Sequence, residues 1–169
     1  MPTTKSKAII PVTGRPAETA VRELIRTLGI LERVMQPYFA RHGISGSQWG
    51  VLRALHRAEA EGLSGLRQTD LSERLLIRPP SVTGALDRLE RAGLVERGGS
   101  ATDMRAKQVT LSPKGRQLVE RVLKGHQAQI EAVMSGLKKN EQADLHRLLF
   151  RLRKHLEQFL AHNMSANAG

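Results

Sequence analysis

Two consecutive prolines interrupt a helical stretch of this sequence, and they restrict its possible folds more than any other feature. Pro79 and Pro80 open the segment RPPSVTGALDRLERAGLVER, which directly follows the helical pattern QTDLSERLLI. Proline lacks an N–H group and breaks a helix from within, but the first turn of a helix accommodates it well. It also disfavours the helical conformation at the preceding residue, Arg78. The prolines therefore predict that one helix ends and another begins at once, with a sharp turn between them.

The second helix of this pair has one apolar face and one small, cationic face. Val82, Ala85, Leu86 and Leu89 follow the i, i+3, i+4, i+7 spacing of a face that packs on a core. The opposite side carries Pro80, Gly84, Asp87 and Arg91, with Ser81 and Arg88 at its flanks and Thr83 nearer one edge. Small residues followed by cations suit a helix that enters the major groove of DNA, and the helix N-terminus offers N–H groups to a phosphate. The alternative is an ordinary solvated helix face.

A short ribbon follows the helix pair. Leu94–Arg97 and Lys107–Leu111 are strand-like, and the polar segment GGSATDMRA between them predicts a loop. Arg105, near the tip, can enter a minor groove, and Asp103 can accept hydrogen bonds from its guanidinium group and hold it extended. The alternative is a surface ion pair of little energetic value. A helix pair followed by such a ribbon predicts a winged helix-turn-helix.

Helical patterns flank this unit on both sides and predict a mainly α fold with a small β wing. The first helix is expected at 17–41, with a kink or a displaced end at Pro37, and the next begins after Ser47 as its N-cap. Ser112 is expected to cap a helix over 113–137, and Asn140 to begin a last helix that ends near 162. Apolar stripes on the outer helices predict that they bury each other in a homodimer; the residues are Leu24, Leu28, Leu31, Leu145, Leu148, Leu149, Leu152, Leu156 and Phe159.

Composition narrows the class of function. A net charge of +11 over 169 residues indicates a polyanionic partner, either nucleic acid or an anionic membrane surface. The absence of cysteine excludes disulfides and thiolate chemistry. Without a nucleophile motif, a phosphate-binding loop or histidines at metal-ligand spacing, the chain is predicted to be neither an enzyme nor a metal or cofactor protein. Because it has no secretory signal and no long apolar run, we expect a cytoplasmic protein.

Three segments, SGSQWGVLRAL, LRQTDLSERLLIRPPSVTGALDRLERAGLVER and DMRAKQVTLSPKGRQL, resemble the multiple antibiotic resistance regulator (MarR) family of bacterial transcription factors. The resemblance extends over about residues 17–161. It implies dimerisation helices at 17–41 and 113–161 and a DNA-binding lobe at 47–112, with the helix-turn-helix at about 68–92 and the wing at about 94–111. Residues 1–16, which lack periodicity, are expected to form a mobile tail, and 162–169 a second tail.

The resemblance implies a homodimeric repressor that binds a pseudo-palindromic operator, with the recognition helix 79–92 in the major groove and the wing in the minor groove. Many family members carry arginine where this chain has Gly84, so that guanine contact is absent here. We then expect Ser81, Arg88, the wing and DNA shape to determine sequence preference. The expected DNA-contacting residues are Arg78, Pro80, Ser81, Thr83, Gly84, Arg88, Arg97, Asp103, Arg105 and Lys107.

Release of DNA by a small phenolic or other anionic ligand is also implied by the resemblance. The residues expected to line the ligand site are Arg22, Arg26, Met35, Tyr38, His42 and Trp49. Two alternatives remain open at this stage. The chain could be a helical adaptor for another protein, or a DNA-binding module that is indifferent to sequence and to ligands.

Overall fold

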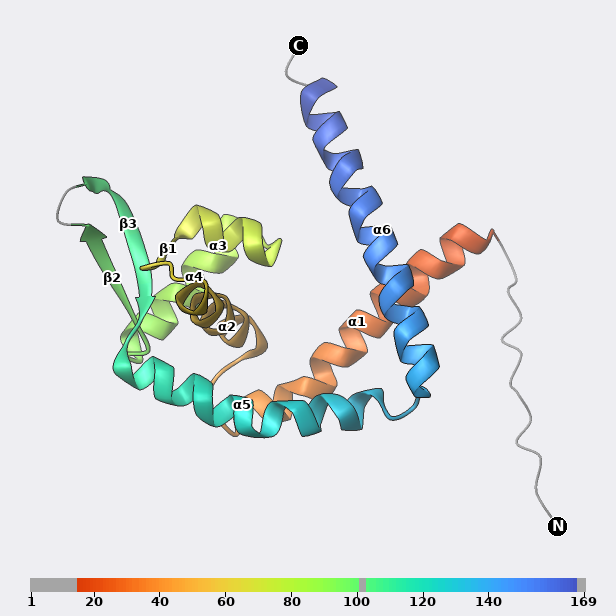
Figure 1. Ribbon diagram of the computed structural model, residues 1–169, viewed down its shortest axis with the longest axis horizontal. Helices are drawn as coiled ribbons and strands as arrows, with labels where there is room; N and C mark the ends of the chain where they lie inside the picture. The colour runs from red at the N-terminus through yellow and green to blue at the C-terminus, as the bar shows by residue number, and fades with distance from the viewer. Residues whose placement is uncertain (1–14, 101–102, 167–169) are drawn as a thin grey trace. The chain divides into compact units, whose positions relative to one another are not determined.

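Six helices and three strands make up the part of the chain that the computed structural model describes, which is residues 15–100 and 103–166 (Figure 1). Side chains at 99–107 and 164–166 lie outside this description. The elements in chain order are α1 (Pro16–Ala40), α2 (Gly46–Ala60), β1 (Leu66–Arg67), α3 (Gln68–Leu75), α4 (Pro79–Arg91), β2 (Val95–Ser100), β3 (Asp103–Leu111), α5 (Pro113–Met134) and α6 (Lys139–Ala166). The mainly α fold with a small β wing is confirmed.

The chain divides into two compact units, residues 1–123 and 124–169. The core of the first unit forms where α2, α3, α4, the sheet and the start of α5 contribute apolar side chains. The largest fully buried side chains are Val51, Leu52, Leu55, Leu71, Val82, Leu86, Leu89, Val109, Leu111, Val119 and Val122. Each such side chain stabilises the fold by about 1.5–3 kcal/mol relative to exposure. This core holds the helix pair and the wing in one lobe.

The wing belongs to a three-stranded antiparallel sheet in the order β1-β3-β2. The predicted loop at 98–106 was wrong, because β2 continues to Ser100 and β3 begins at Asp103. Gly98 and Gly99, which indicated a turn, pair instead with the backbone of β3. Glycine adopts extended conformations as readily as turn conformations. Pairing with β3 therefore determines that these two glycines are extended.

Ser45, and not the predicted Ser47, is the N-cap of α2. The Ser45 hydroxyl accepts a hydrogen bond from the Gln48 N–H (3.2 Å), and Gln48 Oε1 accepts one from the Ser45 N–H (2.8 Å). This reciprocal capping requires Glu or Gln three residues after the capping residue. Gly50 occupies that position relative to Ser47, so the sequence SGSQ already favoured Ser45.

The last helix is longer than predicted at both ends. It begins at Lys139, where Asn140 had been expected as the cap, and Glu141 Oε2 accepts a hydrogen bond from the Lys138 N–H (2.8 Å). It continues to Ala166, so the expected tail at 162–169 is helical as far as 166. Residues 164–166 are methionine, serine and alanine, so no proline or glycine is present there to end the helix at 162.

The first helix continues through Pro37 and ends at Ala40. Only one turn follows this proline, so few backbone hydrogen bonds are lost there. In contrast, α5 ends at Met134, short of the expected 137. Residues 1–14 of the predicted N-terminal tail lie outside the described residues. Among the described helices, none is both long enough and apolar enough to cross a bilayer.

Candidate nucleic-acid interface

Helix α4 has the two faces that its sequence predicted. Val82, Ala85, Leu86 and Leu89 have no exposed surface, whereas Pro80, Ser81, Arg88 and Arg91 on the other side are exposed. Burial of four apolar side chains fixes the rotation of the helix about its axis. The exposed face therefore has a defined direction relative to the lobe, as a surface that recognises another molecule requires.

The turn before α4 is formed as the two prolines predicted. Arg78 has extended backbone angles (φ −64°, ψ 143°), and Pro79 and Pro80 occupy the first turn of the helix. Pro79 and Pro80 have no backbone N–H group to offer. The N–H groups of Ser81 and Val82 both donate to the Arg78 carbonyl (2.9 and 3.3 Å). The expectation that this helix start offers free N–H groups to a phosphate was therefore wrong.

The same turn contains a strained residue, Leu76. Its backbone is left-handed (φ 53°, ψ 37°), and it is the only residue other than glycine with a positive φ in the described part of the chain. The side chain is 76% exposed, so little packing compensates for this conformation. The left-handed region costs an L-residue roughly 1–2 kcal/mol, a cost that glycine avoids.

Replacement Leu76→Gly is expected to raise the free energy of unfolding by about 0.5–1 kcal/mol. The gain from relieved strain exceeds the entropy that glycine adds to the unfolded chain. Urea denaturation with linear extrapolation measures the change. Leu63→Gly is the control, because Leu63 is also exposed but has no positive φ. A lower stability in Leu76→Gly, matching the control, would contradict the strain.

Thr83, expected to contact DNA, uses its hydroxyl within the lobe. It donates to the Pro79 carbonyl (3.0 Å) and accepts a hydrogen bond from Gln68 Nε2 (2.6 Å). Gln68 was not among the predicted site residues. A glutamine at the start of the first helix of the pair gives no local signal that it reaches the second helix.

Arg88 lies beside Gly84 on the exposed face of α4. A Cβ atom placed on Gly84 would lie 3.6 Å from Arg88 Nη1, an ordinary van der Waals distance, so the guanidinium group lies along the helix surface beside the glycine. Arg88 is exposed and forms no ion pair within the described residues. Its charge is therefore available to a partner.

Arg97, one of the residues predicted to contact DNA, forms ion pairs with two carboxylates of α4. Its guanidinium group forms a short ion pair with Asp87 and lies 3.4 Å from Glu90 Oε2. Asp87 lies on the face of α4 that the sequence assigned to DNA, where a carboxylate would repel phosphates. Arg97 therefore neutralises this face and ties β2 to α4.

The other three predicted wing residues lie on β3. Asp103 pairs through its backbone with Ser100, and Lys107 with Gly99, which places Arg105 between these two pairs on the same strand. The side chains of all three lie outside the described residues. Contacts from Asp103, Arg105 and Lys107 to DNA therefore stay predictions.

A junction built around Ser112 joins the wing to α4 and α5. The Ser112 hydroxyl donates to the Gly93 carbonyl (2.7 Å) and accepts from the Gly115 N–H (2.9 Å), which confirms Ser112 as the cap of α5. Its own N–H donates to the Leu94 carbonyl (3.1 Å). Because α5 approaches this carbonyl so closely, a Cβ on Gly115 would lie 2.0 Å from the Leu94 oxygen.

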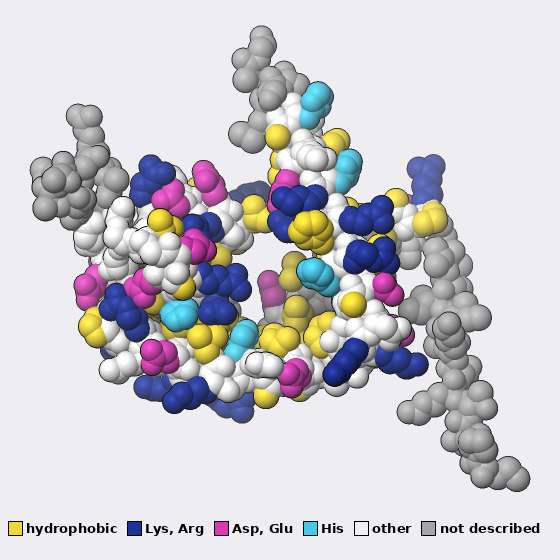
Figure 2. Space-filling view, in the orientation of Figure 1, with side chains coloured by type: hydrophobic (Ala, Val, Ile, Leu, Met, Phe, Trp, Pro, Cys, Tyr) yellow, Lys and Arg dark blue, Asp and Glu magenta, His cyan; other side chains and the backbone are white. Residues whose placement is uncertain are grey.

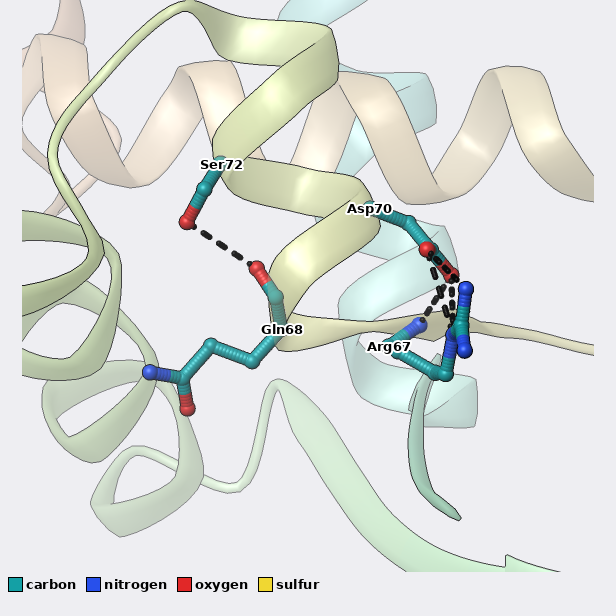
Figure 3. Close-up of polar contacts among 4 residues, drawn as sticks. All are labelled: Arg67, Gln68, Asp70 and Ser72. Atoms are coloured by element: carbon teal, nitrogen blue, oxygen red, sulfur yellow. Dashed lines mark hydrogen bonds and ion pairs between the residues drawn. The ribbon is translucent and has the colours of Figure 1, made fainter. Parts of the chain in front are cut away.

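The beginning of α3 is held by a charged pair (Figure 3). Arg67 donates from its backbone N–H and from its guanidinium group to the Asp70 carboxylate (2.9 and 2.8 Å). These hydrogen bonds keep the pKa of Asp70 below its ordinary value, so the carboxylate stays charged at neutral pH. Ser72 donates to the Gln68 carbonyl (3.1 Å) from the next turn.

The six residues expected to bind a ligand divide into two groups. Met35, Tyr38 and Trp49 are buried, and the rings of Tyr38 and His42 meet edge to face at 5.3 Å. Burial raises the pKa of the Tyr38 hydroxyl, and this hydroxyl donates to the Val122 carbonyl. Arg22 and Arg26 lie at least two turns earlier on α1, where they line an open hollow of about 500 Å³.

The apolar stripes of α1 and α6 lie on the surface of the chain. Figure 2 shows hydrophobic side chains exposed along α6 between cationic ones. The nine residues predicted to form a dimer interface are between 37% and 57% exposed; they are Leu24, Leu28, Leu31, Leu145, Leu148, Leu149, Leu152, Leu156 and Phe159. Contiguous exposed apolar surface of this kind indicates a contact with another molecule.

Comparison with known proteins identifies the family. A family model described as MarR family matches residues 42–106. The transcriptional repressor YetL of Bacillus subtilis (strain 168) is 33% identical over 111 residues, which cover 66% of this chain and 65% of YetL. The homoprotocatechuate degradative operon repressor of Escherichia coli is 32% identical over 126 residues, which cover 75% of this chain and 77% of the repressor.

The fold agrees with these matches. The crystal structure of a mutant MarR from E. coli, complexed with operator DNA, superposes with a TM-score of 0.70 at 24% identity, covering 79% of this chain and 93% of that one. Three observations agree. They are the helix pair with its wing, the matching family model, and the sequence identity over three quarters of a known repressor. The chain belongs to the MarR family of winged-helix transcriptional regulators.

Proposed function

We propose that this chain represses transcription as a homodimer that binds a pseudo-palindromic DNA operator. The observation that carries the proposal is the orientation of α4, whose apolar side is fully buried while Ser81 and Arg88 face outward. Ser81 can donate to a base or a phosphate, and Arg88 can bind guanine or a phosphate. The similarity to a repressor and to a structure solved with operator DNA supports the same function.

In this proposal the wing enters the minor groove beside the major groove that α4 occupies. The strands β2 and β3 form a ribbon longer than the sequence predicted, which extends the reach of the residues near its tip. Arg105 is the proposed minor-groove residue, with Asp103 to orient it. Arg97 acts differently from the other cations, because it neutralises Asp87 and supports the wing rather than binding DNA directly.

Two copies of the chain are proposed to associate through α1 and α6. Their exposed leucines and phenylalanine are too many for a stable solvated surface. A symmetric dimer presents two recognition helices to two half-sites, so the operator is expected to have matching two-fold symmetry. Light scattering is expected to give twice the chain mass of 18.7 kDa.

Replacement of either Arg88 or Arg105 by alanine is expected to weaken operator binding by about 1–3 kcal/mol. Each variant removes a charge that the proposal places against DNA. Mobility shifts on the region upstream of the protein's own gene measure the loss. Arg151→Ala removes an exposed arginine from α6 and is the matched control, expected to bind normally. Unchanged affinity in both Arg88→Ala and Arg105→Ala would refute these contacts.

Ligand-dependent release is proposed for the group around Tyr38, which is buried, and His42, which is half-buried. A phenolic acid could stack on these rings, and burial would strengthen its hydrogen bonds. Trp49 is the only tryptophan of the chain and stacks on Phe39 (5.9 Å), so its fluorescence reports on this region. Homoprotocatechuate or salicylate is expected to change the fluorescence and to release the operator. DNA binding that neither acid alters would contradict this part of the proposal.

The exposed apolar faces also fit a second function, that of an adaptor for another protein. An adaptor would be monomeric when isolated, and its basic surface would bind DNA weakly and without sequence preference. Such binding is lost with a modest increase in salt, whereas a specific operator complex retains a large affinity advantage over other DNA. Selection from a random DNA library therefore distinguishes the two functions.

A further inference from the structure

Gln68 is the polar side chain that links the first helix of the pair to the outward face of the second. It is the first residue of α3, and its Nε2 lies 2.6 Å from the hydroxyl of Thr83, fifteen residues later on α4. Both residues are half-buried at the edge of the exposed face. Gln68 is therefore close to the surface proposed for DNA although it belongs to another helix.

The hydrogen-bond chemistry of Thr83 determines which way the Gln68 amide faces. The Thr83 hydroxyl has one proton, and it donates this proton to the Pro79 carbonyl (3.0 Å). It can therefore only accept from Gln68, which must present its NH₂ group rather than its oxygen. Within the described residues, Gln68 Oε1 and the second amide proton have no other partner.

The backbone of Gln68 is immobilised separately from its side chain. Figure 3 shows Arg67 bound to Asp70 on one side of the helix start, and Ser72 bound to the Gln68 carbonyl. The amide of Gln68 extends in a different direction from these contacts. It is therefore positioned before any ligand binds, which lowers the entropy cost of a further contact.

The neighbouring surface is open. Gly84 follows Thr83 and has no side chain, and among the residues that the structure describes only Arg88 brings a side-chain atom, Nη1, within 4 Å of its Cβ position. A base pair can therefore approach the backbone of α4 at this point once the flexible side chain of Arg88 moves aside. The free oxygen acceptor and N–H donor of the Gln68 amide match the N6 amino group and the N7 atom of adenine.

We propose that Gln68, held by Thr83, recognises an adenine in the major groove of the operator. This rests on the proposed DNA-binding function and extends it to a residue outside the recognition helix. Thr83 then has a positioning role, and its own hydroxyl does not bind the base. The absence of a side chain at Gly84 leaves room for the glutamine to do so.

Selection of bound duplexes from a random library, with intact chains, tests the proposal. Wild type is expected to select an adenine at one position of each half-site, and Gln68→Ala to lose that preference alone and to bind the selected site about tenfold more weakly. Thr83→Val, which cannot accept the hydrogen bond, is expected to lose the same preference, and the double variant to lose little more. Gln48→Ala is the matched control, because it removes an amide that caps the start of α2 and that the proposal does not place against DNA.

The outcomes separate the two levels of the proposal. If wild type selects no sequence, the proposed function fails and not merely the role of Gln68. A second outcome is that wild type selects a site but Gln68→Ala lowers the affinity for all DNA sequences equally. A general loosening of the lobe, as expected for Gln48→Ala, would have that effect, and the recognition of adenine would then be overturned. Thermal unfolding of each variant verifies that the lobe is folded under the binding conditions.

Discussion

Replacement Gly115→Ala is expected to destabilise the lobe by at least about 3 kcal/mol. The added methyl group would lie 2.0 Å from the carbonyl oxygen of Leu94, which is a backbone atom. Overpacking costs about 1–3 kcal/mol where side chains can move aside, and more where they cannot. Here relief requires α5 to move away from the wing, which breaks the bond from the Ser112 N–H to the same carbonyl.

Denaturation by urea measures this loss, and Gly29→Ala is its control. Gly29 lies in α1, and beyond its chain neighbours and its own helix backbone no atom of the described residues lies within 4 Å of its Cβ position. The control is therefore expected to gain about 0.5–1 kcal/mol from the better helix propensity of alanine. Equal stability of Gly115→Ala and wild type would show that α5 does not approach Leu94 as closely as described.

Introducing two carboxylates into α6, as Leu152→Glu with Leu156→Glu, is expected to convert the proposed dimer to a monomer. Both leucines are exposed in the single chain, at 41% and 48%, so their replacement leaves the folded lobe intact. In a dimer the same positions would bury unpaired charges against apolar surface, which is strongly unfavourable. A monomer binds half-sites one at a time, so operator affinity is expected to fall by about 10²–10⁴-fold.

Light scattering and mobility shifts together test this effect. Gln158→Glu is the control, because it adds a carboxylate to the same helix outside the apolar stripe. The control is expected to remain dimeric and to bind DNA. A dimer that persists in the double variant would show that α6 does not form the interface.

Local patterns in the sequence were sufficient to predict the elements of the lobe. The spacing of Val82, Ala85, Leu86 and Leu89 identified the buried face of α4, and the two prolines located its first residue. These features depend on helix periodicity and on the chemistry of single residues. Where the sequence-based prediction failed locally, as at Ser45, a recognisable capping pattern had been overlooked.

Contacts between distant residues were not predictable in the same way. Thr83 and Arg97 are both predicted to contact DNA, and the structure adds that Thr83 binds Gln68 and that Arg97 binds Asp87. Polar residues on an exposed helix face can bind either a neighbour in the fold or an external partner. Only the packing of α3 and β2 against α4 decides between them, and periodicity carries no information on that packing.

The junction at Ser112 has a consequence for how the lobe opens. One hydroxyl and one N–H join the end of α4, the start of the wing and the first turn of α5. Because Ser112 directly follows β3, a movement of that strand strains the hydrogen bonds of Ser112 to Gly93, Leu94 and Gly115 together. Movement of the wing is therefore coupled to the end of α4 and to the first turn of α5.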